Sequence, residues 1–131
     1  MDFLESLINY RADDANDLKN KELCISLFKK NGLLSFDRKF YQDGHFTASG
    51  IVLNKNKTHI LLTHHKFLDK WIQLGGHIDK LDNTVYGAAL RECREESGID
   101  NIELISNNIF DIDIHNIPKK CCKNRARTFA L

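Results

Sequence analysis

Several features that mark particular protein classes are missing from this 131-residue chain. It has no run of about 18 apolar residues, so the sequence predicts no transmembrane helix. The start, Met1 to Glu5, lacks a basic region followed by an apolar run, which argues against a secretory signal. The formal net charge is only +1, so no whole-molecule field points to nucleic acid or a membrane as a partner. A small globular protein is the class that remains.

Cysteine is sparse, and its spacing excludes the common cysteine motifs. The four cysteines, Cys24, Cys93, Cys121 and Cys122, form no Cys-x-x-Cys pair. Cys24 and Cys93 lie on the apolar stripes of expected helices, where buried thiols are the simplest interpretation. The six histidines show no spacing typical of a zinc site either. We therefore expect a reducing, cytoplasmic location.

The length and the 42% of hydrophobic residues fit one core, so residues 1–131 are expected to form a single domain. N-terminal helices are expected within about residues 1–32, followed by a core of about residues 44–118. Residues 119–131 contain five basic residues and show neither a helical nor a strand periodicity, so they are expected to be an irregular tail. The sequence thus predicts helices first and a mixed α/β region after them.

Local signals place the individual elements. Asp13 or Asp14 can cap the second N-terminal helix, which is expected to end at Asn31 and Gly32. In residues 110–115 polar and apolar residues alternate, which predicts a strand with Phe110, Ile112 and Ile114 facing inward. Further strands are predicted at residues 47–53, 58–63 and 71–74.

One predicted helix carries a cluster of glutamates. It is expected to begin after Asn83 or Thr84, both good N-cap residues, and to end at Gly98, a typical C-cap residue. The glutamates, at spacings i, i+3 and i+4, share one helical face. They are Glu92, Glu95 and Glu96. Like charges at this spacing repel unless something neutralises them, and a solvated face with Arg91 and Arg94 as ion-pair partners is one interpretation.

Two consecutive glycines before this helix favour a ligand site. Gly75 and Gly76 follow the strand-like residues 71–74 and are expected to form a turn. Glycine lets the backbone approach a ligand or a metal closely. Hard cations such as Mg²⁺ and Mn²⁺ bind through a few carboxylates together with substrate phosphates. A strand, two glycines, a loop and a glutamate helix together point to metal-dependent phosphate chemistry.

The segment from Gly75 to Ile99 resembles the signature sequence of the Nudix hydrolases, which cleave nucleoside diphosphates linked to another group. The family run Arg-Glu-x-x-Glu-Glu-x-Gly-apolar is met at every position from Arg91 to Ile99. Residues 44–49 and 71–77 are similar to a bacterial branch with a Gly-Gly-His opening. The resemblance implies an α/β/α sandwich with a mixed sheet, preceded here by the N-terminal helices.

The resemblance also implies roles for individual residues. Glu92, Glu95 and Glu96 would bind Mg²⁺ or Mn²⁺, joined by the carbonyl of Gly75, and Arg91 would orient the glutamates through an ion pair. The implied function is a metal-dependent pyrophosphohydrolase for a small-molecule nucleoside diphosphate derivative, with no nucleic acid and no membrane as partner. Bound metal would lower the pKa of a water, and a glutamate or a loop carboxylate would act as the base.

Two departures from the family pattern leave alternatives open. Asp82 stands at the position of the usual loop glutamate, and the loop between it and Arg91 is one residue longer than the common form, so either Asp79 or Asp82 could support the site. The family usually continues through further strands and a closing helix. The alternative function is therefore a C-terminally shortened, catalytically weak or inactive Nudix-like binding module, and an uncovered strand edge would favour a homodimer.

The remaining polar residues are weaker candidates. His77 follows the glycines and could contact a phosphate or order the loop. Asp111 and Asp113 share one face of a predicted strand, where exposure to solvent is the more common outcome. Arg38 could steer an anionic substrate or be an ordinary surface residue.

Overall fold

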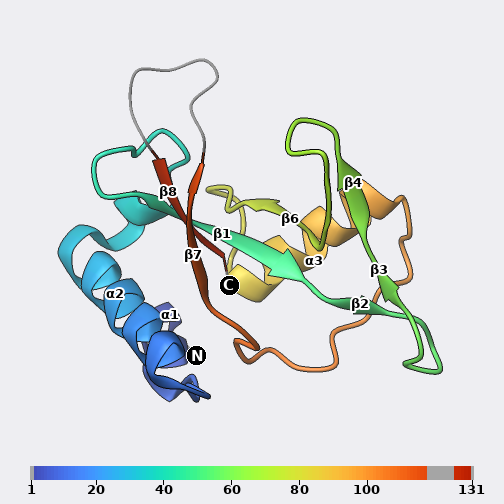
Figure 1. Cartoon of the computed structure of the whole chain (residues 1–131), viewed down its shortest axis with the longest axis horizontal. Coiled ribbons are helices and arrows are strands. Elements are labelled where there is room, and N and C mark those ends of the chain that lie inside the picture. Colours follow the sequence, from blue (N-terminus) through green and yellow to red (C-terminus); the bar gives the residue numbers. More distant parts are fainter. Residues whose placement is uncertain (1, 118–125, 131) are drawn as a thin grey trace.

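The chain forms two helices and a short 3-10 helix, followed by strands with one further helix between them (Figure 1). The computed structural model describes residues 2–117 and 126–130. In chain order the elements are α1 (Phe3–Asn9), α2 (Ala15–Asn31), η1 (Gly32–Phe36), β1 (His45–Gly50), β2 (Val52–Leu53), β3 (Ile60–Leu61), β4 (Thr63–His65), β5 (Lys70–Ile72), β6 (Leu74–His77), α3 (Val85–Ser97), β7 (Asp113–Ile117) and β8 (Ala126–Ala130). The mixed α/β class with N-terminal helices agrees with the sequence-based expectation.

The helix boundaries follow from local capping. The Asp14 side chain accepts a hydrogen bond from the backbone N–H of Asp17 at 2.8 Å and so caps α2. Thr84 caps α3 in the same way by accepting from the N–H of Gly87 at 3.0 Å. Gly98 ends α3 in the left-handed conformation, with φ of 68°. These boundaries confirm the helices that the sequence predicts.

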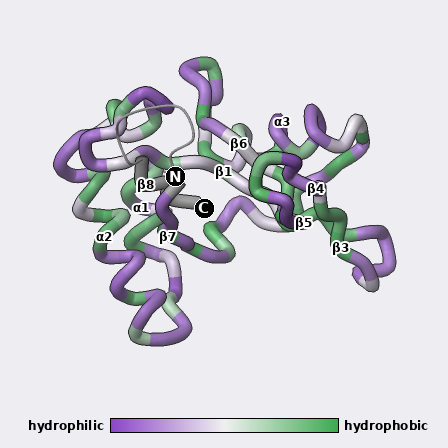
Figure 2. The backbone as a smooth tube through the Cα atoms, turned by 45° about the horizontal axis from the view of Figure 1, so that its top comes forward, coloured by the Kyte–Doolittle hydropathy of each residue, from purple (hydrophilic) through white to green (hydrophobic). Residues whose placement is uncertain are grey.

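A four-stranded sheet with the order β6-β1-β8-β7 forms the centre of the structure. Strand β1 pairs antiparallel with β6 and parallel with β8, so the sheet is mixed. Strands β7 and β8 pair antiparallel. Two small antiparallel pairs, β2–β3 and β4–β5, complete the strands of the described part of the chain. Figure 2 shows β3, β4 and β5 together on the side of the molecule away from α2.

Residues 126–130 differ from the irregular tail that the sequence predicts. They form β8, which is hydrogen-bonded to β1 on one side and to β7 on the other. The strand is short, and its pairing with β1 joins segments far apart in the sequence, so no local period reveals it. The other tail residues, 119–125 and 131, lie outside the described residues.

The helices share one face of the central sheet. Side chains alternate along a strand, so Phe46, Ala48 and Gly50 of β1 lie on the same face. The Phe46 ring lies 5.0 Å from that of Phe3 in α1, measured between centroids. At the other end of β1, a Cβ on Gly50 would lie 2.5 Å from the Sγ of Cys93 in α3. Among the described residues these helices therefore cover one face, whereas an α/β/α sandwich has helices on both.

One hydrophobic cluster joins the helices to this face of the sheet. Its buried members are Leu7, Tyr10, Cys24, Leu27, Phe46, Ala48, Ile78, Ala88 and Ile112. Ile114 packs against the cluster, as predicted, whereas Phe110 is 81% exposed because the chain becomes a strand only at Asp113. No helix in residues 2–117 is both long and apolar enough to cross a membrane.

Candidate active site

The two glycines lie in a strand and not in the turn that the sequence predicts. Gly75 pairs with Ser49 and Gly76 with Ala48 across β6 and β1. The N–H of Gly75 donates a hydrogen bond of 3.0 Å to Oε2 of Glu96, so it points away from β1, towards the edge of β6 that faces α3. In an antiparallel pair the N–H and C=O of one residue point to the same side. The Gly75 carbonyl therefore faces the same edge as its N–H.

Gly76 allows a glutamate to lie directly against the strand. A Cβ at this position would lie 2.6 Å from both Cδ and Oε2 of Glu92. The Glu92 side chain is consequently only 17% exposed, although it carries a carboxylate. Gly76 therefore has a steric role. Because glycine has no Cβ, the Glu92 carboxylate can lie close to the strand.

Arg91 connects the glutamates of α3 to the loop before the helix. Its Nε and Nη2 donate to Oδ1 and Oδ2 of Asp82, at 3.0 and 2.8 Å, in a bidentate pair. Nη2 also donates to the carbonyl of His77 at 3.0 Å. Nη1 donates to Oε1 of Glu92 at 3.0 Å and to Oε2 of Glu95 at 3.2 Å. One guanidinium therefore fixes the positions of three carboxylates.

Of the two loop carboxylates left open by the sequence, Asp82 is the main partner of Arg91. Its side chain is 8% exposed, and it also accepts a hydrogen bond from the N–H of Asp79 at 2.8 Å. The carboxylate of Asp79 is 67% exposed and lies 3.7 Å from Nη2 of Arg91. The hydrogen bonds from Arg91 lower the pKa of Asp82, and those to Asp82 raise the pKa of Arg91.

The three glutamates lie on neighbouring parts of α3 but have different partners. Glu92 and Glu95 are bound by Arg91, whereas Glu96 accepts the hydrogen bond from Gly75. Within residues 2–117 no three His, Cys, Asp or Glu side chains are grouped closely enough to hold a metal ion. The potential metal ligands around Gly75 are nevertheless all carboxylate and carbonyl oxygens, which are the ligands that a hard divalent cation prefers.

A pair of histidines lies on the sheet face opposite α3. The ring of His77 stacks on that of His45, with centroids 5.4 Å apart. His45 is 2% exposed, and no hydrogen bond of good geometry reaches its ring nitrogens within the described residues. Burial, and then the charge of His77, lower the pKa of His45. Burial, and then the charge of Arg38, lower the pKa of His77.

The other predicted polar candidates have structural partners or are exposed. Asp113 is exposed and its Oδ2 lies 3.0 Å from Nδ1 of His115. Asp111 is exposed as well. Trp71 of β5 contacts His64 of β4 across the hairpin. The sequence does not predict this contact, because it depends on the register of the two strands.

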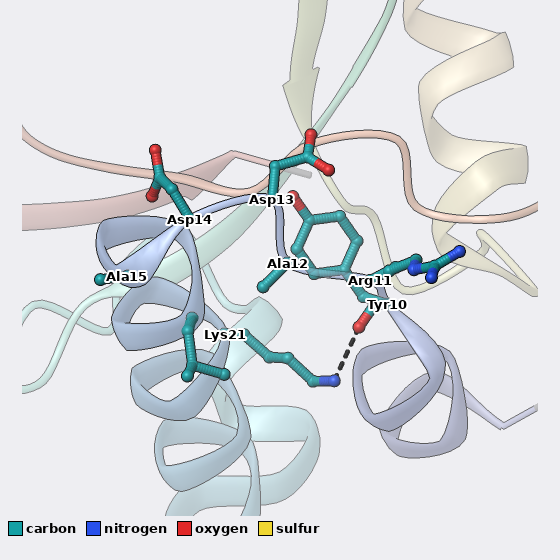
Figure 3. Close-up of a pocket in the computed structure, with 8 residues that line it drawn as sticks. Tyr10, Arg11, Ala12, Asp13, Asp14, Ala15 and Lys21 are labelled. Atoms are coloured by element: carbon teal, nitrogen blue, oxygen red, sulfur yellow. Dashed lines mark hydrogen bonds between the residues drawn. The ribbon is translucent and has the colours of Figure 1, made fainter.

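An open pocket with a volume of about 390 Å³ lies at the junction of α1 and α2 (Figure 3). Lys21 donates to the carbonyls of Ile8 and Tyr10, at 2.7 and 2.6 Å, and so binds the end of α1. The Tyr10 hydroxyl donates to Asp17, and burial followed by this contact raises the Tyr10 pKa. The polar groups here hold the two helices together, and none of the glutamates of α3 lines the pocket.

Fold and site together define a mixed α/β domain in which a glutamate-bearing helix is held against a glycine-containing edge strand. Comparison with known protein families matches residues 44–122 to the NUDIX domain. The match covers more than half of the chain and includes the site, so the chain belongs to the Nudix family. No curated protein shows significant similarity to it. Nudix proteins are hydrolases that typically use divalent metals and generally act on nucleotide-derived small molecules.

Proposed function

We propose that the chain is a metal-dependent pyrophosphohydrolase that cleaves a nucleoside diphosphate linked to another group. The observation that carries this proposal is the arrangement of α3 against β6. Glu96 is hydrogen-bonded to the N–H of Gly75, and Glu92 lies against Gly76 where any side chain would collide with it. Carboxylates held beside the backbone carbonyl of Gly75 form an oxygen-rich surface suited to a phosphate-bound cation.

The residues that would hold Mg²⁺ or Mn²⁺ are Glu92, Glu95 and Glu96 together with the carbonyl of Gly75. Their chemistry fits these ions, because every donor is an oxygen and three of the groups are carboxylates. When bound, the ion neutralises charge on the diphosphate and lowers the pKa of a water.

The chain's own groups bind, position and accept protons in this proposal. Arg91 holds Glu92 and Glu95 while it is itself held by Asp82, so its positive charge offsets repulsion among the carboxylates. Glu95 and Glu96 are exposed, so solvent reaches them. We assign the general base to one of these two glutamates, since a base must lie within hydrogen-bond reach of the attacking water.

A second candidate function is a Nudix-like module that binds its ligand without cleaving it. Two observations favour it. Arg91 is hydrogen-bonded to two of the three glutamates, and within residues 2–117 no three potential metal ligands are grouped together. The two candidates differ in turnover and not in ligand class. Hydrolysis, rather than binding, is therefore the measurement that separates them.

A screen of nucleoside diphosphate derivatives with Mg²⁺ or Mn²⁺, with product phosphate released by an added phosphatase, tests the enzyme proposal. We expect turnover that chelation by EDTA stops. Glu92→Gln and Glu96→Gln keep side-chain size but remove a charged donor, so each should abolish turnover while the protein remains folded. Glu22→Gln, the same change at an exposed position of α2, serves as the control and should leave turnover unchanged. Equal turnover in all three variants would contradict the assignment.

A further inference from the structure

Two adjacent leucines are exposed where α2 ends. Leu33 is 76% exposed and Leu34 is 52% exposed, and both belong to η1. A single exposed leucine is common, but two neighbours leave a contiguous apolar surface in water. In Figure 1 this end of α2 and the strands β3 and β4 lie at opposite ends of the molecule. We name residues 32–42 the Leu33–Leu34 loop.

The two ends of the Leu33–Leu34 loop are held together. The carboxylate of Asp43 accepts a hydrogen bond of 3.1 Å from Nδ2 of Asn31 and lies 2.8 Å from Nζ of Lys30. Within the loop, the N–H of Asp37 donates to the carbonyl of Leu34 at 3.0 Å and closes the turn after the leucines. Compact loops with close ends are a recurrent type of functional surface segment. The leucines therefore belong to a closed loop and not to a frayed helix end.

The inner side of the loop is anchored in the core. The ring of Phe36 lies 5.1 to 5.7 Å, between centroids, from three other rings, those of Phe3, Phe28 and Phe46. Ser35, between Phe36 and the leucines, is fully buried. These contacts fix the loop while its two leucines stay outside the core. Because the backbone is ordered before a partner arrives, little further entropy is lost on binding.

Basic residues flank the leucines on both sides along the chain. Two lie in the last turn of α2 and two follow η1, and all four are exposed: Lys29, Lys30, Arg38 and Lys39. The acidic residues between positions 29 and 43 are Asp37 and Asp43, and Asp43 is paired with Lys30. The net charge of the whole chain is only +1, so this end has a local excess of positive charge that the total conceals.

The combination of apolar and basic side chains indicates the kind of partner. A second copy that docked through the same loop would bring like charges together. The phosphates of a nucleic acid would attract the basic residues but offer no hydrocarbon to the leucines. An anionic bilayer provides both, because its headgroups attract lysine and arginine and its acyl boundary accepts leucine. Tyr41, 40% exposed in this loop, is of a residue type enriched at membrane interfaces.

We propose that the Leu33–Leu34 loop is a docking site for the surface of an anionic lipid bilayer. Leu33 and Leu34 insert at the level of the headgroups, and the flanking basic residues contact the lipid phosphates. Two leucines and a few charges provide far less binding energy than a membrane-spanning helix, so the association is weak and reversible. The proposal does not depend on the activity proposed for the glutamates of α3.

Co-sedimentation with lipid vesicles tests the proposal. We expect binding to vesicles that mix phosphatidylserine with phosphatidylcholine, release from them at high salt, and no binding to pure phosphatidylcholine. The double variant Leu33→Ala/Leu34→Ala should weaken binding roughly 5- to 50-fold, because each change removes apolar groups that insert. The double variant Arg38→Gln/Lys39→Gln should weaken it about 5-fold for each charge removed.

Two matched controls separate the loop from the rest of the surface. Leu81→Ala changes a leucine that is 93% exposed elsewhere, and it should bind vesicles like the wild type. Lys66→Gln/Lys70→Gln removes two exposed lysines beside the exposed apolar residues of the β4–β5 hairpin, and it should also bind like the wild type. All the replaced side chains are exposed, so thermal melting should show that every variant is folded.

Several results would overturn the docking site. They are absence of binding to phosphatidylserine vesicles, equal binding to pure phosphatidylcholine, full binding by the leucine variant, or an equal loss in the hairpin variant. Self-association in analytical ultracentrifugation that the leucine variant abolishes would identify a second copy as the occupant. Binding of duplex DNA that requires Arg38 and Lys39 but not the leucines, without vesicle binding, would identify a nucleic acid instead.

Discussion

At the scale of single residues, the site depends on a few contacts made by Arg91. The bidentate pair with Asp82 orients the guanidinium, and the remaining N–H groups then reach Glu92 and Glu95. Lysine offers a point charge without this planar geometry, so it could not hold three carboxylates in the same way. Asp82 is accordingly a positioning residue, because it acts on the glutamates only through Arg91.

Asp82→Asn should weaken this arrangement while keeping the side-chain size. The variant removes the charge that orients Arg91 at a nearly buried position, so we expect a loss of about 1–3 kcal/mol in the free energy of unfolding. Turnover should fall roughly 10- to 100-fold, as is common for residues that orient metal ligands, with a higher metal concentration needed for half-maximal rate. Urea denaturation and a metal titration of the rate measure the two effects.

Asp79→Asn is the matched control for this prediction. Its carboxylate is 67% exposed and lies 3.7 Å from the same nitrogen of Arg91. An exposed pair of this kind is worth at most about 1 kcal/mol. If the two aspartate variants lowered the metal affinity equally, the special role of Asp82 would be wrong.

At the scale of elements, the contact between β6 and α3 determines where the glutamates lie. Gly75 approaches the backbone of β1 closely, because a Cβ there would collide with Cα of Ser49 and the carbonyl of Ala48. Gly76 approaches only the end of the Glu92 side chain. The two neighbouring glycines therefore serve the fold and the site respectively.

Gly76→Ala should separate activity from stability. The new Cβ displaces a flexible carboxylate rather than the backbone, so we expect the free energy of unfolding to change by no more than about 1 kcal/mol. Glu92 should leave its place beside the strand, and turnover should be lost. Gly75→Ala should instead unfold the protein, because its Cβ meets backbone atoms of β1. Circular dichroism with thermal melting and a turnover assay distinguish the variants, and retained activity in Gly76→Ala would contradict the steric role.

The elements also show which parts of the structure can be predicted from sequence. Helix α3 was predicted correctly because its signals, Thr84 and Gly98, lie within the helix termini. The sequence predicts less well which face of this helix is turned towards the core. The sequence shows that the three glutamates share a face but not which of them lies nearest the core: Ala88 is buried, and Glu92, one turn further on, is half-buried against Gly76. The apolar stripe of a helix does not show that a glycine in the neighbouring strand leaves space for a carboxylate.

The strands were harder to predict because their partners are distant in sequence. The glycines at 75 and 76 indicate a turn locally, yet they pair with β1 in a strand. Residues 126–130 have no clear period, yet β1 and β7 hold them in the centre of the sheet. The glutamate cluster of α3, in contrast, can be located from its spacing, because a helical face needs only local sequence, while its role in binding metal stays a prediction.

At the scale of the whole molecule, strand β8 connects the two halves of the central sheet. Its backbone pairs with β1 and β7, so its N–H and C=O groups serve both neighbours. A proline in a central strand removes one ladder hydrogen bond and distorts the backbone. Thr128→Pro should therefore destabilise the chain by about 3 kcal/mol or more, whereas Thr128→Val is the control because it keeps the backbone N–H. A thermal melt of both variants measures this, and equal melting temperatures would show that β8 is dispensable.

The stability of the molecule should also fall at acid pH through His45. Burial, followed by the charge of His77, lowers the His45 pKa below its ordinary value near 6.5, while the backbone of Phe40 and the charge of Asp37 oppose this. The unfolded chain therefore binds a proton first as the pH drops. The stabilising contribution of the neutral ring is complete above about pH 6.5 and is lost as the pH falls through the folded-state pKa.

His45→Gln should flatten this part of the pH profile. Urea denaturation at several pH values should show a smaller loss of stability than in the wild type below about pH 6.5, the ordinary pKa of histidine. His115→Gln, at an exposed histidine, is the control and should follow the wild-type profile. A parallel shift of the His45→Gln curve at all pH values would indicate a packing effect only.

The position of β8 between β1 and β7 also determines when the sheet can form during synthesis. Strand β1 can pair with β6 as soon as both have left the ribosome, but β7 gains its described neighbour only when residues 126–130 follow. Sheets that depend on contacts between distant segments fold slowly, because the chain must lose loop entropy before the pairing is gained. Nascent chains should therefore expose the edges of β1 and β7 until β8 emerges, which makes this stage of folding the one at which a chaperone would act.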